Sequence, residues 1–220
     1  GIDWYFNEVE ELQTSIACGA EAAKTVSLTE EQLQNYYGIK VIPDAIPDGY
    51  VQTDEEKTYQ IGYDADGNVI DDNCVMRYEN SETAGWFTIR ARSTDMGEMT
   101  SYVSGGLKPM TVSGVKVTAA HYPAGSSGGT FTDGYLATYK KNGVTVNVQS
   151  EGLSRDEFCA LVENLLAELR KRTYRGRPIG EATVQKYLTV VSAVLSDAKR
   201  NEIIQKNPAR MIDLPMTHRT

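Results

Sequence analysis

The residues whose chemistry is easiest to interpret in this sequence are arginines and lysines between positions 170 and 200. Guanidinium and ammonium groups along a helix suit the phosphates of duplex DNA, and such contacts hold a protein on DNA without reading its sequence. The alternative is a solvated face that pairs with acidic parts of the same molecule. The candidate DNA-binding residues are Arg170, Lys171, Arg172, Arg175, Arg177, Lys186, Lys199 and Arg200, with Tyr174 and Tyr187 interleaved.

Charge is divided unevenly along the 220 residues of the chain. Residues 1–168 hold 11 Lys+Arg and 26 Asp+Glu, a net charge of -15, whereas residues 169–220 hold 11 and 4, a net charge of +7. An acidic body repels nucleic acid and a basic tail attracts phosphate. This division predicts two segments of different origin or with different partners, although tail and body could also attract each other within one molecule.

The cysteines and the first of the two histidines are predicted to be structural. Cys18, Cys74 and Cys159 are widely spaced and form no CxxC pair, which favours buried free thiols over a thiolate metal site. His121 stands beside Tyr122 in a strand-like segment, where a lone histidine is more often structural than a general base. These residues therefore predict neither a nucleophile with its base nor a metal centre.

Two loops have the composition of a functional motif but not its spacing. The run Asp64–Asn68 begins like a calcium loop but lacks the glycine and glutamate that an EF-hand needs at positions six and twelve. A hairpin turn is predicted there, with a weak surface cation site at Asp71 and Asp72 as the alternative. The run Gly125–Gly129 lies between strands, so it is not a nucleophile elbow. We expect no enzyme, with no catalytic residue, no metal and no cofactor.

The basic residues need a scaffold, and the stretch from Arg175 to Pro208 has the pattern of an amphipathic helix with a short helix after it. The first helix should end near Asn201, and Asn207 can cap the second with proline at its first position. Apolar residues on one face are Val184, Tyr187, Leu188, Val191, Leu195 and Ala198. The other face, which should meet water or a polyanion, holds Gln185, Lys186, Thr189, Ser192, Ser196 and Lys199.

The landmarks of this stretch are, in order, Thr183-Val184, Tyr187, Leu188, Ser192, Leu195, Ala198 and Asn207-Pro208-Ala209. They resemble the second half of the core-binding (SAM-like) domain of phage integrases, the tyrosine recombinases, with Gly180 where that family has a Ser or Thr cap. The family's domain clamps duplex DNA, so the resemblance implies that residues 169–220 bind duplex DNA. The first half of that domain and the catalytic domain have no counterpart here, so Tyr174 and Tyr187 are not taken as nucleophiles.

The missing partner helices leave the apolar face of the predicted helix without a surface to contact. Leaving six apolar side chains in water costs on the order of 10 kcal/mol, at about 1.5–3 kcal/mol each. The helix that begins at residue 154, an N-terminal helix or a second copy of the chain could cover this face. We therefore predict a homodimer through the C-terminal helices.

Upstream, residues 57–150 change to a period of two, which predicts strands. The Asn142-Gly143 pair between two alternating segments is a strong hairpin signal. The expected strands, part of an antiparallel sheet of five to seven, are Thr58–Tyr63, Val75–Glu79, Trp86–Ser93, Thr111–Tyr122 with a bend at Ser113-Gly114, Tyr135–Lys140 and Val144–Gln149.

Capping boxes indicate two helices beside this sheet. Thr29 with Gln32 opens one that should stop at Gly38, and Ser154 with Glu157 opens one that should cover the sheet. A third helix is expected over residues 2–17, through Trp4, Val9, Leu12 and Ile16. The predicted fold class is α+β, an antiparallel sheet with a covering helix followed by a small basic all-α tail. The predicted divisions are 1–27 (helix and linker), 28–168 (acidic sheet domain) and 169–220 (integrase-like segment).

The phrases Leu28–Leu33, Tyr36–Gly38 and Gly152–Ser154 resemble uncharacterised α+β domains on the outer side of membrane-anchored proteins of Gram-positive bacteria. This resemblance spans residues 28–167 and implies no functional residues. Two hypotheses follow: a non-catalytic integrase-like fusion that binds duplex DNA, or an extracytoplasmic ligand- or protein-binding or sensing module with a relic integrase tail. The location would be cytoplasmic in the first case and extracytoplasmic in the second, and no run approaches the ~18 apolar residues of a membrane span.

Overall fold

The structure is a computed structural model that describes residues 1–15, 21–94, 100–102, 106–124, 131–168, 173–174, 177–178 and 181–201. The chain divides into two compact units, Gly1–Leu169 and Arg170–Thr220, and each is described by itself. Among the described residues, no helix is long and apolar enough to cross a membrane.

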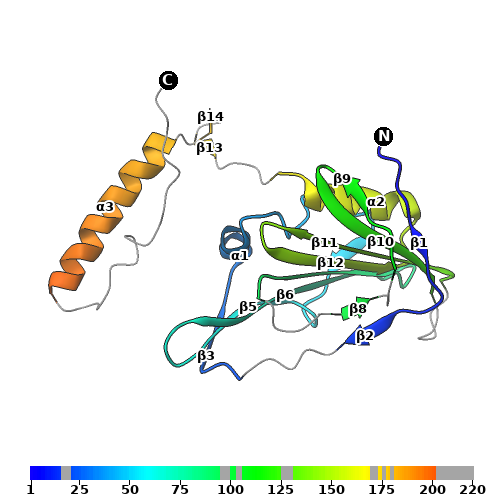
Figure 1. The fold of residues 1–220 in the computed structure, drawn as a ribbon, viewed down its shortest axis with the longest axis horizontal. Coiled ribbons are helices and arrows are strands. Elements are labelled where there is room, and N and C mark those ends of the chain that lie inside the picture. The colour runs from blue at the N-terminus through cyan, green and yellow to red at the C-terminus, as the bar shows by residue number, and fades with distance from the viewer. Residues whose placement is uncertain are drawn as a thin grey trace. The chain divides into compact units, whose positions relative to one another are not determined.

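Ten described strands of the first unit form one mixed sheet (Figure 1). They are β1 (Asn7–Glu8), β3 (Lys24–Ser27), β4 (Tyr50–Gln52), β5 (Thr58–Tyr63), β6 (Val69–Asn80), β7 (Trp86–Arg92), β9 (Met110–Val112), β10 (Val115–Pro123), β11 (Asp133–Lys141) and β12 (Val144–Glu151). Their order is β1-β10-β11-β12-β7-β6-β5-β3, with β4 also paired to β6 and β9 to β10. A separate two-stranded ribbon joins β2 (Gln13–Ser15) to β8 (Thr100–Tyr102).

This architecture shows that the predicted fold class was wrong. The sheet has ten described strands rather than five to seven, and it is mixed because β1 runs parallel to β10. The C-terminal unit is not all-α either, since β13 (Thr173–Tyr174) and β14 (Arg177–Pro178) form an antiparallel pair before its helix. The missed strands are two to four residues long, too short for alternation along the sequence to be recognised.

The central hairpins follow from local sequence, as predicted. Asn142 and Gly143 have φ of 50° and 77°, the left-handed conformation that a two-residue hairpin turn requires, and they connect β11 to β12. Asp64 closes the β5–β6 turn because its carboxylate accepts hydrogen bonds from the backbone N–H groups of Asp66 and Asn68 at 2.9 and 2.8 Å. The hairpin interpretation of the Asp64–Asn68 run is therefore confirmed.

Two predicted elements were wrong. The segment Thr111–Tyr122 is not one bent strand, because the chain reverses at Ser113 and Gly114, both at positive φ, so that β9 pairs with β10. Residues 2–17 contain no helix in their described part, and strands β1 and β2 lie there instead. The apolar spacing that indicated a helix comes from a segment whose side chains reach both faces of the sheet. Trp4 belongs to the main core, whereas Val9 and Leu12 pack on the opposite face.

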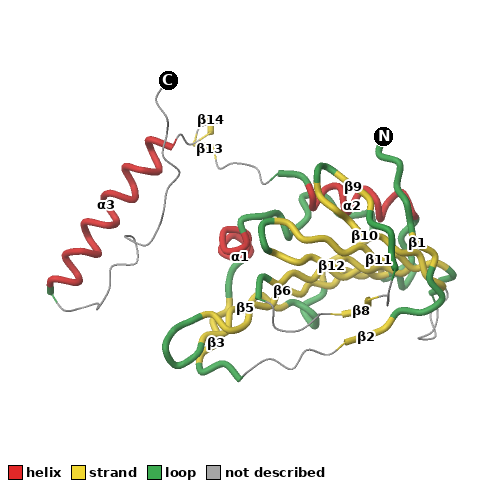
Figure 2. Tube along the Cα trace, in the orientation of Figure 1, coloured by secondary structure: helices red, strands yellow, loops and turns green. Residues whose placement is uncertain are grey.

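Helices α1 (Glu30–Tyr37) and α2 (Arg155–Leu166) cover one face of the sheet, here called the inner face (Figure 2). Both begin with the predicted capping boxes, at Thr29 and Ser154, and α1 ends with Gly38 in the left-handed conformation. Alternate residues of the strands join the helices in one core, as Phe87, Ile89 and Ala91 of β7 do. The intervening residues form the outer face. From α2 the core receives Phe158, Cys159, Leu161, Val162, Leu165 and Leu166.

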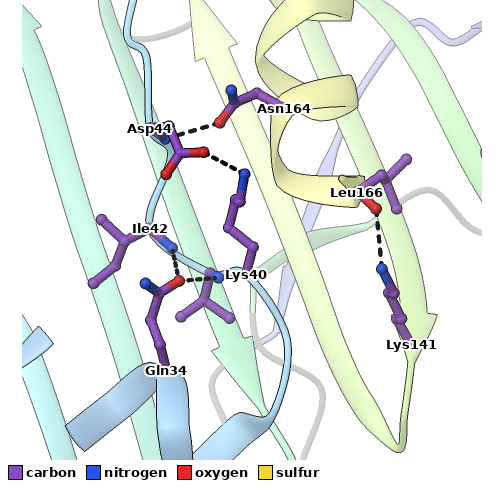
Figure 3. A network of polar contacts seen from close by, with 8 residues as sticks. Gln34, Lys40, Ile42, Asp44, Lys141, Asn164 and Leu166 are labelled. Atoms are coloured by element: carbon purple, nitrogen blue, oxygen red, sulfur yellow. Dashed lines mark hydrogen bonds and ion pairs between the residues drawn. The ribbon is translucent and has the colours of Figure 1, made fainter. Parts of the chain in front are cut away.

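A polar network fixes the chain that leaves α1 (Figure 3). Gln34 Oε1 accepts hydrogen bonds from the N–H groups of Val41 and Ile42, and Asp44 N–H donates to Asn164 Oδ1 of α2 at 2.9 Å. Lys40, only 4% exposed, directs its ammonium group to Asp44. At the end of α2, Lys141 Nζ donates to the carbonyl of Leu166 at 3.0 Å, a favourable place for a cation. These contacts hold both helices on the inner face.

The second unit contains the β13–β14 pair and the helix α3 (Glu181–Arg200). The predicted helix end near Asn201 is confirmed, because the last backbone bond of that turn runs from Asn201 N–H to the carbonyl of Asp197. The predicted short helix at Asn207 and Pro208 lies outside the described residues.

Candidate functional site

The structure describes only part of the predicted DNA-binding cluster. Arg170, Lys171, Arg172 and Arg175 lie outside the described residues. Arg177 is in β14 and Lys186 in α3, but neither side chain is described. Lys199 and Arg200 are exposed in the last turn of α3, where cations are favoured by the helix dipole. Arg200 Nη1 lies 3.2 Å from Asp197 Oδ1, and a surface ion pair of this kind contributes little to stability. Two of the eight predicted side chains are thus placed, both on one exposed turn.

The apolar face predicted for α3 is described only in part. Val191 is 47% exposed, and Leu195 and Ala198 are half-buried. Val190 and Val194, which lie outside the predicted face, are 63% and 62% exposed. A second copy of the chain that covers the predicted face stays a prediction.

A different polar surface lies on the outer face of the sheet in the first unit, and sequence reasoning did not identify it. It is formed by side chains that alternate with core residues on four adjacent strands, β6, β7, β12 and β11. We call it the polar strip, and it consists of Arg77, Thr88, Arg90, Asn147, Gln149 and Thr138.

Strand register brings the members of the polar strip together from distant parts of the sequence. Arg90 is directly opposite Asn147 across the β7–β12 pair, and Asn147 is opposite Thr138 across the β12–β11 pair. In the next row, Thr88 lies between Arg77 and Gln149. Opposed side chains on one face of an antiparallel pair have Cβ atoms about 4.5–5.5 Å apart, so each row is a set of close neighbours.

Two atoms at the centre of the polar strip are buried and have no hydrogen-bond partner. They are Arg90 Nε, a donor, and Asn147 Oδ1, an acceptor. The Asn147 side chain is otherwise anchored, because its Nδ2 donates to Thr138 Oγ1 at 3.0 Å. Asn147 and Thr88 are 5% and 3% exposed although they point away from the main core. Buried polar atoms in folded proteins are nearly always paired, so this place is unusual.

The guanidinium groups of the polar strip are balanced by nearby carboxylates. Arg77 Nε donates to Glu79 Oε1 at 2.6 Å, and Glu56 lies 3.8 Å from both Arg77 and Arg90. Beside the strip, Arg92 pairs with Asp71 at 3.6 Å. Burial lowers the pKa of Arg90, and Glu56 partly offsets this effect. Three cations thus face three anions, and the surface is polar without a strong net charge.

The β10–β11 end of the outer face is closed by a small apolar cluster. Ala120, Tyr122 and Leu136 are buried there, with Val9 and Leu12 packed on them. Tyr122 links the cluster to the polar strip, because Gln149 Nε2 donates to its hydroxyl at 3.1 Å. Burial raises the pKa of Tyr122, so its hydroxyl stays protonated. The strip therefore has one apolar border.

His121 is held by two carboxylates at the β1 edge of the sheet. Its Nδ1 lies 2.6 Å from Glu8 Oε2 and its Nε2 2.7 Å from Asp133 Oδ1. Burial lowers the pKa of His121, but the hydrogen bonds to the two carboxylates outweigh burial, and the net shift is upward. When the ring is protonated, both nitrogens donate to these carboxylates, and His121 then acts as a cationic clamp.

The acidic residues after the β5–β6 turn are both engaged by groups of the protein. Asp72 is buried, and its carboxylate accepts hydrogen bonds from Ser93 N–H, Ser93 Oγ and Thr94 N–H at 2.7–2.9 Å. Asp71 pairs with Arg92. No cluster of metal-ligating side chains is present in the described part of the chain. The weak cation site at Asp71 and Asp72 thus stays an alternative, in competition with these protein contacts.

The predicted free thiols are confirmed at two of three positions. Cys74 and Cys159 are free and buried, and burial raises the pKa of Cys159 to about 11, so neither is a reactive thiolate. Cys18 lies outside the described residues.

An open depression of about 470 Å³ lies at the far sheet edge, beside β3 and the β5–β6 turn, and is lined by Ala23, Lys24, Val26, Tyr63, Asp64, Ala65 and Gly67.

One sequence signal pointed toward the polar strip. Residues 86–92 alternate strictly, which already separates Thr88, Arg90 and Arg92 from the core residues of β7. The position of Asn147 beside Arg90 depends on the β7–β12 register, which cannot be read from any local sequence pattern.

Comparison of the chain with protein-family models, curated proteins and solved structures gave no match.

Proposed function

We propose that the first unit is a binding module that holds a polar ligand on the polar strip and performs no reaction on it. The observation that carries this proposal is the buried pair of unpartnered atoms, Arg90 Nε and Asn147 Oδ1. Leaving such atoms unpaired costs about 1–3 kcal/mol each, and a ligand that pairs them recovers this free energy on binding. The proposal gives the ligand-binding hypothesis from the sequence a specific surface.

The chemistry of the polar strip favours binding over catalysis. Its six residues offer guanidinium, amide and hydroxyl groups, and none is a histidine or a cysteine. General acid–base or nucleophilic catalysis needs a group that gains or loses a proton near the working pH. Arginine, asparagine, glutamine and threonine do not do so. We therefore assign the strip a recognition role.

A thermal-shift screen tests this binding proposal. The intact chain is heated with a panel of neutral sugars, carboxylates, amides, nucleotides and short peptides, and one class should raise its melting temperature. Arg90→Gln should reduce that shift. Lys199→Gln, which removes one positive charge from the second unit, is the matched control and should leave it unchanged. The proposal is contradicted if no ligand class raises the melting temperature, or if the ligand raises the melting temperature of Arg90→Gln as much as that of the unsubstituted protein.

A second function, binding of duplex DNA by the second unit, is favoured by the division of charge. Residues 169–220 carry a net charge of +7 against -15 for the rest of the chain, and Lys199 and Arg200 are exposed together. The resemblance to the integrase core-binding domain supports the same proposal. It requires no base-specific contact, because phosphate neutralisation alone provides non-specific affinity.

Fluorescence anisotropy of a labelled duplex tests DNA binding. The intact chain is titrated across a salt series beside a Lys199→Gln, Arg200→Gln double variant, and Arg90→Gln serves as the charge control from the first unit. If both side chains contact phosphates, the slope of log K against log salt should become shallower by about 2 in the double variant. A duplex that stays unbound at low salt, or equal slopes in all three proteins, contradicts the proposal.

A further inference from the structure

We infer that the ligand of the polar strip is a neutral saccharide. This inference rests on the binding function proposed above for the first unit and adds the chemical class of the ligand. Three properties of the strip support it: balanced charge, an unpaired donor and an unpaired acceptor on opposed residues, and the partial exposure of the arginine that carries the donor.

Balanced charge disfavours a strongly charged ligand. Arg77 donates to Glu79 at 2.6 Å, and Glu56 lies at 3.8 Å from both Arg77 and Arg90. A polyanion would have to approach these carboxylates, and a polycation the guanidinium groups, so each meets like-charge repulsion. A neutral ligand avoids both costs and still finds charged hydrogen-bonding groups, which form the stronger hydrogen bonds.

The unpartnered atoms favour a hydroxyl group. Arg90 Nε can only donate, and Asn147 Oδ1 can only accept. A hydroxyl oxygen accepts from the first while its proton is donated to the second. A carboxylate has no proton for Asn147, and an ammonium group has no lone pair for Arg90. A sugar ring carries several hydroxyl groups, and these also suit the remaining members of the strip, Thr88, Gln149 and Thr138.

Arg90 is the less fixed member of this pair. Its side chain is 32% exposed, and its ionic contact to Glu56 is at 3.8 Å, longer than a hydrogen bond. Asn147, in contrast, is 5% exposed and fixed by Thr138. Because part of the Arg90 side chain reaches solvent and its ion pair is long, it can change rotamer while Asn147 keeps its place. The geometry points to a site that opens by movement of one side chain and closes over a bound sugar.

Trp86 provides a spectroscopic probe of this site. It is on the same face of β7 as Arg90, and Arg77 stacks on its ring at 4.6 Å from the centroid. The chain has two tryptophans, so a Trp4→Phe background leaves Trp86 as the single emitter. A ligand that displaces Arg77 changes the surroundings of Trp86, and its fluorescence then reports binding.

The experiment titrates the Trp4→Phe protein with neutral trisaccharides of glucose, mannose, xylose and N-acetylglucosamine. Glucuronate trisaccharide and a capped neutral tripeptide form the comparison arms. At least one neutral sugar should change Trp86 fluorescence with a saturable curve. Asn147→Leu, which removes the acceptor but keeps the side-chain volume, should weaken its dissociation constant at least tenfold. Lys199→Gln should have no effect, and Thr88→Val gives a second test if Asn147→Leu fails to fold.

Each outcome decides the inference. A neutral sugar that binds and loses affinity in Asn147→Leu or Thr88→Val supports it. Binding of the peptide or of glucuronate alone overturns the saccharide assignment and leaves the binding module standing. Equal sugar affinity in the variants places the sugar elsewhere and also overturns the inference. If no arm binds, the saccharide assignment is overturned, and if the thermal-shift panel also shows no stabilising class, the binding module is overturned with it.

Discussion

The ring of Tyr122 lies directly against the backbone of Gly134, its opposed residue on the neighbouring strand. A Cβ at position 134 would overlap this ring, so glycine is required by close approach and not by its dihedral angles. Gly134→Ala should push Tyr122 off its contacts with Gln149 and Glu151 and lower the free energy of unfolding by about 1–3 kcal/mol. Urea denaturation measures this loss.

A double-mutant cycle identifies the cause of that loss. In a Tyr122→Ala background the ring is absent, so Gly134→Ala should become nearly neutral. If Gly134→Ala lowers stability equally in both backgrounds, the ring contact is not the reason for the glycine.

His121 should make stability depend on pH. Its folded pKa is raised by hydrogen bonds to Glu8 and Asp133, so its contribution is fully present below the unfolded pKa of about 6.5 and is lost as pH rises through the folded value. The pKa of Asp133 is lowered by hydrogen bonds from His121 and Thr132, so its contribution is lost at acid pH. The clamp should therefore be strongest in mildly acidic solution.

Thermal unfolding at mildly acidic and mildly alkaline pH tests this prediction. His121→Gln should lower the melting temperature more at the acidic pH, by a small amount, because surface ion pairs contribute about 0.2–1 kcal/mol. Asp133→Asn should remove most of the same difference. An NMR titration of the His121 ring with a midpoint at or below the ordinary histidine value would contradict the assignment.

Asn7 should contribute more than His121 to the attachment of β1. Its buried amide donates to the carbonyls of Lys108 and Ala119 at 3.0 and 2.8 Å and accepts from the N–H of Lys108 at 2.9 Å. Asn7→Ala should lower the free energy of unfolding by about 2–4 kcal/mol, since it removes three hydrogen bonds, one of them buried and two part-buried.

The matched control for Asn7 is Asn164→Ala, which removes a single bond to Asp44 N–H. It should lower stability by about 0.5–1.5 kcal/mol in the same urea titration. A smaller effect for Asn7→Ala than for Asn164→Ala would show that β1 is held by other contacts.

The parts of the fold that could be predicted are those specified within a few residues. The capping boxes at Thr29 and Ser154 and the Asn142-Gly143 turn are local hydrogen-bond or dihedral requirements, and all three appear where the sequence placed them. The alternation of Trp86–Arg92 also separates the two faces of β7, one of which joins the core through Phe87, Ile89 and Ala91.

The N-terminal segment shows why other parts could not be predicted. Trp4, Val9 and Leu12 have helical spacing, yet Trp4 donates to Glu163 of α2 while Val9 and Leu12 lie on the outer face. A chain that passes around a sheet edge produces apolar residues at irregular intervals, which can coincide with a helical period. A contact between residues 159 positions apart, such as that of Trp4 with Glu163, cannot be predicted from the periodicity within a short window of sequence.

The candidate site was missed for a related reason. Arg90 and Asn147 are separated by 57 positions, and only the order of β7 and β12 in the sheet makes them neighbours. Alternation along a strand shows which residues point away from the core, but it does not show which of them are neighbours across the sheet. The predicted DNA-binding residues were easier to find because charge accumulates along the sequence itself.

Lys40 and Asp44 should respond unequally to substitution, because only one of them is buried. The side chain of Lys40 is 4% exposed and that of Asp44 is 40% exposed, and the two form an ion pair in the segment that follows α1. Asp44→Asn leaves a buried ammonium group without its carboxylate, which should cost about 2–3 kcal/mol after allowance for the exposure of Asp44. Lys40→Met keeps the buried stem and removes the charge, so it should cost less than Asp44→Asn. In the double variant neither charge remains, and stability should return close to that of Lys40→Met. Urea titrations of the three variants measure these differences, and an Asp44→Asn variant as stable as Lys40→Met would mean that water reaches the Lys40 ammonium group.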